Sequence, residues 1–214
     1  MKKLLFASLL TSLSSLPSFA TLYTTNWTTG FANGGIVPDN NLSGWSNTRD
    51  VTTMPAGTLQ SVAVDLHLTG GWNGDLYAYL VHDSGFSVLL DRVGPGMFGY
   101  GDAGMNVTLA SVGSYGTVQD NIGTYGGGFV PTGVWNPDNT SGSLGSFVTT
   151  SPNGSWSLFI ADLSGGSVTT VQSWGLQMDI VAVPEVETWV AAALAGAFGA
   201  FWLNRQLFSR HQQS

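Results

Sequence analysis

The chain has 214 residues, of which 9% are charged, and its formal net charge is −7. It contains no cysteine, which excludes a disulfide framework. Residues 21–183 contain eleven Asp, two Arg and no Lys or Glu, so this part carries a formal charge of −9. Such a surface repels nucleic acid and anionic lipid, and we expect no nucleic-acid partner. The 29 glycines favour one turn-rich domain with short additional segments over two domains.

The first twenty residues have the pattern of a secretory signal peptide. Lys2 and Lys3 precede an apolar run at 4–10, and Ser18-Phe19-Ala20 forms a small-x-small cleavage site. The sequence therefore predicts export, with a signal peptide at 1–20 and a mature chain that begins at Thr21.

Residues 21–35 are polar and rich in glycine, and we interpret them as an N-terminal strand and loop. Residues 39–50 match a calcium-loop template at its positions 1, 3, 5, 6 and 12, although no helical pattern flanks them. We keep this segment as an alternative metal loop. Its predicted ligands are Asp39, Asn41, Ser43 and Asp50, with Gly44 at the sixth position.

Period-two alternation of apolar residues predicts four strands in the middle of the chain. A glycine-rich turn at 70–75 leads from the first strand into a returning strand, and a second turn at 82–85 leads into the third. For Tyr77 and Tyr79 we expect packing against a neighbouring sheet. The strands are predicted at 59–68, 76–81, 88–92 and 105–109, and the inward side chains of the first are Val62, Val64, Leu66 and Leu68.

The region between residues 94 and 135 is rich in glycine and aromatic residues. It spells G-x-G-x-x-G twice, but neither copy leads into a helical pattern that would hold a pyrophosphate, so we predict no nucleotide site. A long loop at one end of a β-sandwich is the better interpretation, and such loops often carry binding functions. The loop aromatics that we predict to contact a sugar ligand are Tyr100, Tyr125 and Trp135.

Residues 153–178 hold a second pair of alternating segments, joined by a turn at 162–167. Trp156 and Trp174 lie on the apolar sides of the two segments, so we expect both to be buried, either in one sheet or across the sandwich from each other. We interpret the pair as a hairpin or near-hairpin that closes an antiparallel, jelly-roll-like β-sandwich at 21–183.

The aspartates are the clearest candidates for metal binding, because they fall at predicted strand ends where several loops of a sandwich meet. Carboxylate and carbonyl oxygens are the ligands that Ca²⁺ prefers, and no lysine is present to neutralise them. The alternative is that Asp builds turns. The predicted calcium ligands are Asp75, Asp83, Asp91, Asp102 and Asp162.

The C-terminal residues 184–214 form a separate segment. Val183-Pro184-Glu185 precedes an almost uninterrupted apolar run at 189–203, which predicts a helix, and Arg205 follows. Fifteen residues at about 1.5 Å each give a helix of roughly 22 Å, short for a membrane span of about 30 Å. The order of motif, apolar helix and arginine resembles the PEP-CTERM sorting signal of Gram-negative bacteria. That resemblance implies an exosortase-type partner and transient or permanent membrane association; a plain C-terminal anchor is the alternative.

Residues 36–180 resemble the P domain, also called the P/Homo B domain, which follows the catalytic domain of kexin- and furin-like proprotein convertases. That family often opens on I-P-D-N, carries a G-D-L motif, and ends in two tryptophan-containing strands. The resemblance implies a jelly-roll sandwich and, in some members, bound calcium. The matching residues are Ile36, Pro38, Asp39, Asn40, Gly74, Asp75, Leu76, Asn153, Gly154, Trp156, Leu158, Asp162, Trp174 and Leu176.

No hydrolase motif accompanies this module. The sequence lacks G-x-S-x-G and H-E-x-x-H, and adjacent residues such as His82, Asp83 and Ser84 do not converge as a catalytic triad does. We therefore predict a non-catalytic module of the bacterial cell surface, outer envelope or extracellular matrix, with a structural, adhesive or binding role. The alternatives are a calcium-dependent lectin-like protein that binds extracellular polysaccharide, and an accessory domain of a separately encoded subtilisin-like serine endopeptidase.

Overall fold

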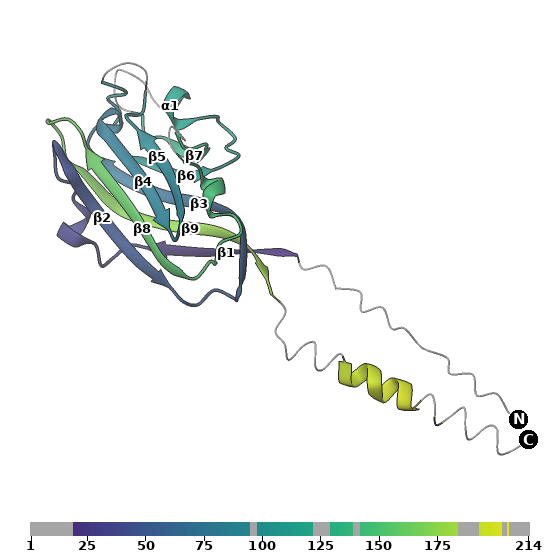
Figure 1. The fold of residues 1–214 in the computed structure, drawn as a ribbon. Coiled ribbons are helices and arrows are strands. Elements are labelled where there is room, and N and C mark those ends of the chain that lie inside the picture. Colours follow the sequence, from purple (N-terminus) through teal and green to yellow (C-terminus); the bar gives the residue numbers. More distant parts are fainter. Residues whose placement is uncertain are drawn as a thin grey trace, which may run out of the picture.

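The structure, a computed structural model, describes residues 19–94, 98–121, 129–138, 142–183, 193–202 and 205. Two β-sheets stack face to face in these residues, which confirms the predicted all-β sandwich (Figure 1). One sheet has five strands in the order β1-β9-β3-β6-β7, and the other has four in the order β2-β8-β4-β5. All neighbours pair antiparallel except β6 and β7, which are parallel.

Seven of the nine strands in the described residues coincide with segments predicted to be strands, whereas β2 and β7 lie in segments that the sequence predicts to be loops. The five-stranded sheet consists of β1 (Ala20–Trp27), β3 (Gly57–Gly70), β6 (Met105–Ala110), β7 (Thr132–Trp135) and β9 (Thr169–Ala182). The four-stranded sheet consists of β2 (Asn41–Val51), β4 (Leu76–His82), β5 (Gly85–Asp91) and β8 (Gly154–Asp162). Short helical turns lie between them: η1 (Ala32–Gly35), η2 (Asn73–Asp75), α1 (Val118–Asn121) and η3 (Leu144–Phe147).

The closing pair of strands is not a hairpin, and this prediction is wrong. β8 lies between β2 and β4 in one sheet, whereas β9 lies between β1 and β3 in the other. The two strands thus face each other across the core, because alternation shows which side of a strand is buried but not which strand pairs with it. The step from β3 to β4 likewise crosses between sheets, while β4 and β5 do form the predicted hairpin.

The core fills the space between the two sheets. Trp156 and Trp174 are both fully buried, as predicted, and so are the inward side chains of β3. The Trp174 indole N–H donates to the Asn47 side-chain oxygen at 2.9 Å, which joins β9 to β2 across the sandwich. Among the described residues, every buried member of this core lies between Val37 and Ile180, and both sheets lie between residues 20 and 182.

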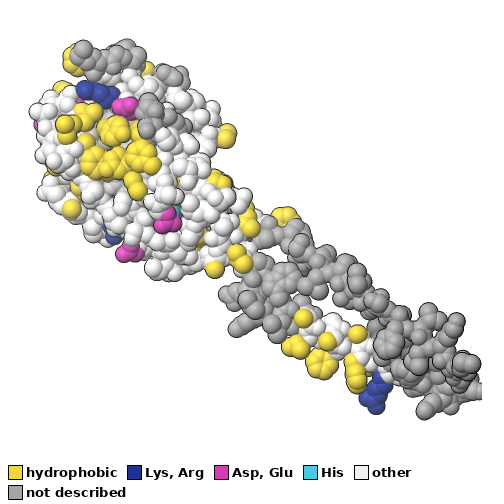
Figure 2. All heavy atoms as spheres, in the orientation of Figure 1, with side chains coloured by type: hydrophobic (Ala, Val, Ile, Leu, Met, Phe, Trp, Pro, Cys, Tyr) yellow, Lys and Arg dark blue, Asp and Glu magenta, His cyan; other side chains and the backbone are white. Residues whose placement is uncertain are grey.

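The four-stranded sheet presents an aromatic surface to the outside. Its inward residues Leu76, Ala78 and Leu80 are buried, whereas Tyr77 and Tyr79 between them are only half-buried. The expectation that these tyrosines pack against a neighbouring sheet is therefore wrong, because they point away from the core. Figure 2 shows an apolar patch over this face. We call it the aromatic face; its rings are Tyr77, Tyr79, Phe86 and Phe159.

The chain enters and leaves the sandwich at neighbouring points, because Ala20 at the start of β1 pairs with Val181 near the end of β9. Residues 1–18 of the predicted signal peptide lie outside the described residues, as do Pro184 and Glu185 of the predicted sorting motif. Val183 is exposed, and its N–H donates to the Ala56 carbonyl at 2.9 Å. Residues 193–202 are helical and lie within the helix predicted at 189–203; Arg205 is helical as well. Among the described residues, no helix has both the length and the apolar character to span a membrane.

Candidate functional site

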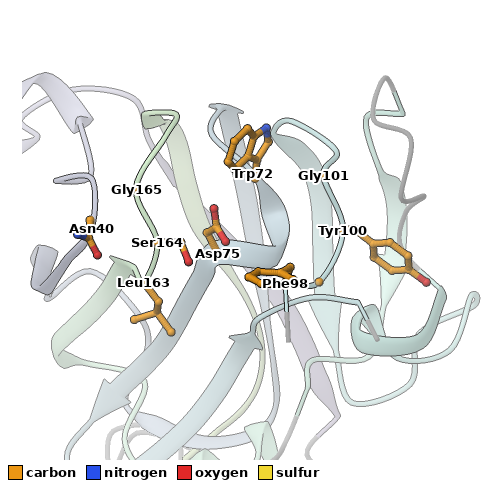
Figure 3. A pocket seen from close by; sticks show the side chains of 10 residues that line it. Asn40, Trp72, Asp75, Phe98, Tyr100, Gly101, Leu163, Ser164 and Gly165 are labelled. Atoms are coloured by element: carbon orange, nitrogen blue, oxygen red, sulfur yellow. The ribbon is translucent and has the colours of Figure 1, made fainter. Parts of the chain in front are cut away.

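An open pocket of about 700 Å³ lies at one end of the sandwich (Figure 3). Three segments that are far apart in the sequence enclose it: the turn before β4, the loop at 98–101, and the connection from β8 to β9. Asn40 contributes from the start of β2. The lining residues are Asn40, Trp72, Asp75, Phe98, Gly99, Tyr100, Gly101, Leu163, Ser164 and Gly165.

Backbone hydrogen bonds hold these segments together. Leu163 donates its N–H to the Asp75 carbonyl at 2.8 Å, which joins the β8–β9 connection to the start of β4. Gly74 donates to the Tyr100 carbonyl at 2.9 Å. A side chain at Gly74 is excluded, because a Cβ there would lie 2.3 Å from the Phe98 carbonyl oxygen. The G-D-L motif thus places Gly74 where the loop at 98–101 passes close to the backbone, and it places the Asp75 carboxylate in the pocket.

Two buried carboxylates meet beneath the pocket. Asp75 lines it and is 5% exposed, and Asp162 lies next to it at the end of β8, fully buried. Burial raises the pKa of both carboxyl groups, since desolvation disfavours the charged form. Hydrogen bonds from Ser164 oppose the rise at both groups, and the charge of Asp75 adds to it at Asp162.

Arg92 partly compensates this negative charge. Its Nη2 lies 3.6 Å from Asp75 Oδ1 and donates to Ser164 Oγ at 2.9 Å. Asp162 Oδ1 accepts the Ser164 N–H at 3.1 Å, but its Oδ2 is buried and has no hydrogen-bond partner among the described residues. Asp39, from the opening I-x-P-D-N stretch, accepts the Gly166 N–H at 3.2 Å and thereby fixes the far side of the same connection.

Two aromatic side chains rise beside these polar groups. Trp72 is 43% exposed and Phe98 is 75% exposed, so both present ring surface to solvent. In Figure 3, Ser164 lies on one side of Asp75 and the Trp72 and Phe98 rings lie on the other, whereas the Tyr100 ring points away from them. Exposed apolar rings next to hydrogen-bonding groups are typical of pockets that bind polar organic ligands.

The structure brings some of the predicted calcium ligands together and separates others. Four of them lie toward the end of the sandwich that carries the pocket: Asp75, Asp91, Asp102 and Asp162. Two of these four are engaged elsewhere, since Asp102 accepts the Phe129 N–H at 3.0 Å and Asp91 pairs with Tyr77 of β4. Asp83 lies in the β4–β5 turn, roughly 25 Å from Asp75 at about 3.3 Å per strand residue. No group of three or more acidic, His or Cys side chains in the described ranges is arranged to hold a metal ion.

The alternative metal loop is wrong. Asn41, Ser43 and Asp50 belong to β2, which is an extended strand rather than a loop. Nine residues separate Asn41 from Asp50, roughly 30 Å at about 3.3 Å per residue, so their side chains do not surround one ion. The template matched residue types but took no account of the strand conformation that pairs this segment with β8.

The predicted sugar-binding aromatics have different positions from those expected. Tyr100 is 7% exposed and Trp135 is 6% exposed, so the expectation of open rings is wrong for both. Trp135 belongs to β7 and donates its indole N–H to the Thr132 carbonyl at 2.9 Å. Tyr125 lies outside the described residues. The exposed rings at the pocket are instead Trp72 and Phe98, which are not among the aromatics predicted from the sequence. The position of Trp72 in the glycine-rich G-G-W-N-G turn is a signal that could have identified it.

The two histidines of the sandwich lie away from the pocket lining. His82 is fully buried and stacks on Trp156, with the ring centroids 3.9 Å apart. Its ring nitrogens face the carbonyl oxygens of Ser155 at 3.1 Å and Ser151 at 2.7 Å. His67 is half-buried on β3. The pocket lining contains no His, so Ser164 has no imidazole base beside it.

Comparisons with known proteins give loose likenesses. No family model matches the chain, and no curated protein matches it. A crystal structure of the serine protease of Aeromonas sobria is similar over 79% of this chain, with 16% identity and a TM-score of 0.47. The crystal structure of that protease in complex with a chaperone gives 15% identity and a TM-score of 0.48. In both cases the match spans 28% of the other chain.

Proposed function

We propose that this chain is an exported, non-catalytic binding module that takes a sugar-like ligand, such as part of an extracellular polysaccharide, in the pocket at the end of its sandwich. The observation that carries the proposal is the combination of exposed Trp72 and Phe98 rings with Asp75, Ser164 and Asn40 in one open pocket. A sugar ring has apolar faces that pack on aromatic rings and hydroxyls that bond to carboxylate and amide oxygens.

The arrangement of carboxylates argues against sugar hydrolysis. Glycosidases of the common kind place two carboxyl groups on either side of the bond to be cleaved. Here Asp75 lines the pocket, but Asp162 is fully buried behind it and is not part of the lining. Burial raises the pKa of Asp75, and Arg92 Nη2 at 3.6 Å opposes that rise, but among the described residues no second carboxyl group lines the pocket opposite Asp75.

Calcium and the cellular address are parts of the same proposal. A cation beside Asp75 and Asp162 would relieve the repulsion between two buried carboxylates and engage the unpartnered Asp162 Oδ2. The signal peptide and the Val183-Pro184-Glu185 segment would bring the module to the surface of a Gram-negative cell, after processing by an exosortase-type enzyme.

The test is a glycan array probed with residues 21–183, followed by calorimetric titration of any ligand found. Trp72→Ala and Phe98→Ala should each weaken binding about tenfold or more, because each removes a ring surface from the pocket. Phe86→Ala removes a ring from the aromatic face instead and serves as the matched control. Binding that survives both pocket substitutions, or is lost in the control alone, would place the ligand elsewhere.

A second candidate function is favoured by the aromatic face. Tyr79 stacks on Phe159 with centroids 4.6 Å apart and contacts Phe86 at 5.3 Å, so three neighbouring strands share one apolar surface. Clustered aromatic side chains are enriched at the centres of protein interfaces. This surface suits an accessory domain that docks onto a separately encoded subtilisin-like serine endopeptidase. Co-purification with such a protease that is lost in Phe86→Ala but kept in Trp72→Ala would support this function over sugar binding.

A further inference from the structure

The outer face of the five-stranded sheet carries a second hollow, which faces away from the four-stranded sheet. It has a volume of about 690 Å³, and its lining comes from β1, β3, β6, β7 and β9. We call it the polar groove. Its polar side chains include those of Asn26, Asp65, Asn106, Thr108 and Ser173. They are exposed or half-buried, and each carries a hydrogen-bonding group.

Strand register explains why the groove is hollow. One row of outward positions crosses the whole sheet, from Asn26 through Gly175, Asp65 and Thr108 to Val134. Gly175 has no side chain in the middle of this row, and a Cβ there would lie 2.1 Å from the Thr25 carbonyl oxygen. The floor is therefore backbone, and the neighbouring side chains form the walls. Five strands at about 4.8 Å spacing give a row roughly 19 Å long.

Asp65 is held in a fixed orientation at the centre of the row. Its Oδ1 accepts the Thr108 hydroxyl at 2.6 Å, and the Gln177 amide donates to Oδ1 at 2.8 Å and to Oδ2 at 3.1 Å. A carboxylate fixed by two neighbours keeps further lone pairs for a ligand without having to reorganise. No Lys or Arg is among the residues that line the groove.

These features select a neutral, hydroxyl-rich ligand. The carboxylate and the formal charge of −9 on residues 21–183 repel anions. A protein partner would need large apolar or aromatic anchors, whereas the only apolar side chains among the described residues that line the groove are Val107 and Val134, and most of the others carry hydroxyl, amide or carboxylate groups. We infer that the polar groove binds a neutral polysaccharide chain that lies across the strands of the five-stranded sheet. This site is separate from the pocket at the end of the sandwich and does not depend on it.

The experiment is affinity electrophoresis of residues 21–183 in native gels that contain a neutral β-glucan, a neutral galactomannan or anionic alginate. We expect at least one neutral polysaccharide to retard the protein, and alginate to retard it less. Asn106→Trp fills the groove from an exposed position, so it should weaken retardation about tenfold without loss of folding, which circular dichroism checks. Thr108→Val removes the hydroxyl that orients Asp65 and should weaken it several-fold, whereas Thr108→Ser should restore binding.

Two control variants separate this inference from the function proposed above. Trp72→Ala disables the pocket at the end of the sandwich, and Ser46→Trp adds a ring to an exposed position on the other sheet. Both should keep the retardation by the neutral polysaccharide. Three results would overturn the inference: no retardation by either neutral polysaccharide, equal retardation of Asn106→Trp and the wild type, or loss of retardation in Trp72→Ala alone.

Discussion

Replacing Trp156 by Ala should remove a large part of the stability of the sandwich. The Trp156 ring is fully buried, stacks on His82, and lies 5.2 Å from the ring of Phe147. An aromatic side chain buries about 150–250 Å², which at about 25 cal/mol per Å² corresponds to roughly 4–6 kcal/mol as an upper estimate. Measured truncations of buried Trp and Phe give about 3–5 kcal/mol, and we expect this range here. Against a total of about 5–15 kcal/mol, the variant would be close to unfolding.

Urea unfolding of residues 21–183, followed by tryptophan fluorescence and far-ultraviolet circular dichroism, measures this loss. Trp156→Phe is the matched control: it keeps an aromatic ring but loses the indole N–H that donates to the Pro152 carbonyl at 3.2 Å. It should cost about 1–3 kcal/mol, mainly because that buried carbonyl loses its partner. A cost below about 1 kcal/mol for Trp156→Ala would refute the assignment of this ring to the centre of the core.

Three further predictions concern the carboxylates and one glycine. Burial raises the pKa of Asp162 in the folded state, so its contribution to stability is fully present below the pKa of the unfolded chain and is lost as pH rises through the folded-state pKa. In calcium-free buffer, Asp162→Asn should therefore gain stability relative to the wild type as the pH rises above the ordinary Asp pKa of about 4. A stability difference that does not change with pH would contradict the burial of this charge. Calcium should raise the unfolding midpoint of the wild type more than Mg²⁺ does at equal ionic strength, and this difference should vanish in Asp162→Asn. Equal increases of the wild-type midpoint by the two ions would indicate charge screening alone. A Cβ at Gly85 would lie 2.3 Å from the buried Phe147 ring, so Gly85→Ala should cost about 1–3 kcal/mol in the same urea assay, while Gly145→Ala, at an exposed position, should cost much less.

Alternation in the sequence identifies most of the strands and their buried side chains, but not β2, where the sequence predicts a metal loop, or β7, where it predicts part of a long loop. The inward side chains of β3 and the two buried tryptophans follow directly from alternation, because burial of one face requires a period of two. Sheet membership did not follow from it. β8 and β9 each alternate in the same way, and the partner of each strand depends on contacts with β2, β4, β1 and β3 that are distant in the sequence.

The candidate site was predictable only in part for the same reason. Asp75 and Asp162 were marked by their positions at strand ends, and the register between β4 and β8 brings them together. Asp83 carries the same sequence signal but follows the opposite end of β4. Among the aromatics, exposure depends on the fold: Tyr100 turns away from the pocket, whereas Trp72 and Phe98 remain exposed. The outward direction of Tyr77 and Tyr79 required the knowledge that Leu76, Ala78 and Leu80 face the core.

Calorimetric titration of the mature module with a glycan selected from the array, followed by mass spectrometry of the recovered glycan, tests the central claim most directly. A non-catalytic binding module should give saturable heat, a dissociation constant that rises about tenfold in Trp72→Ala, and a glycan recovered with its mass unchanged. Cleavage of the glycan during the titration, or saturable binding that Trp72→Ala and Phe98→Ala leave unchanged, would contradict the account.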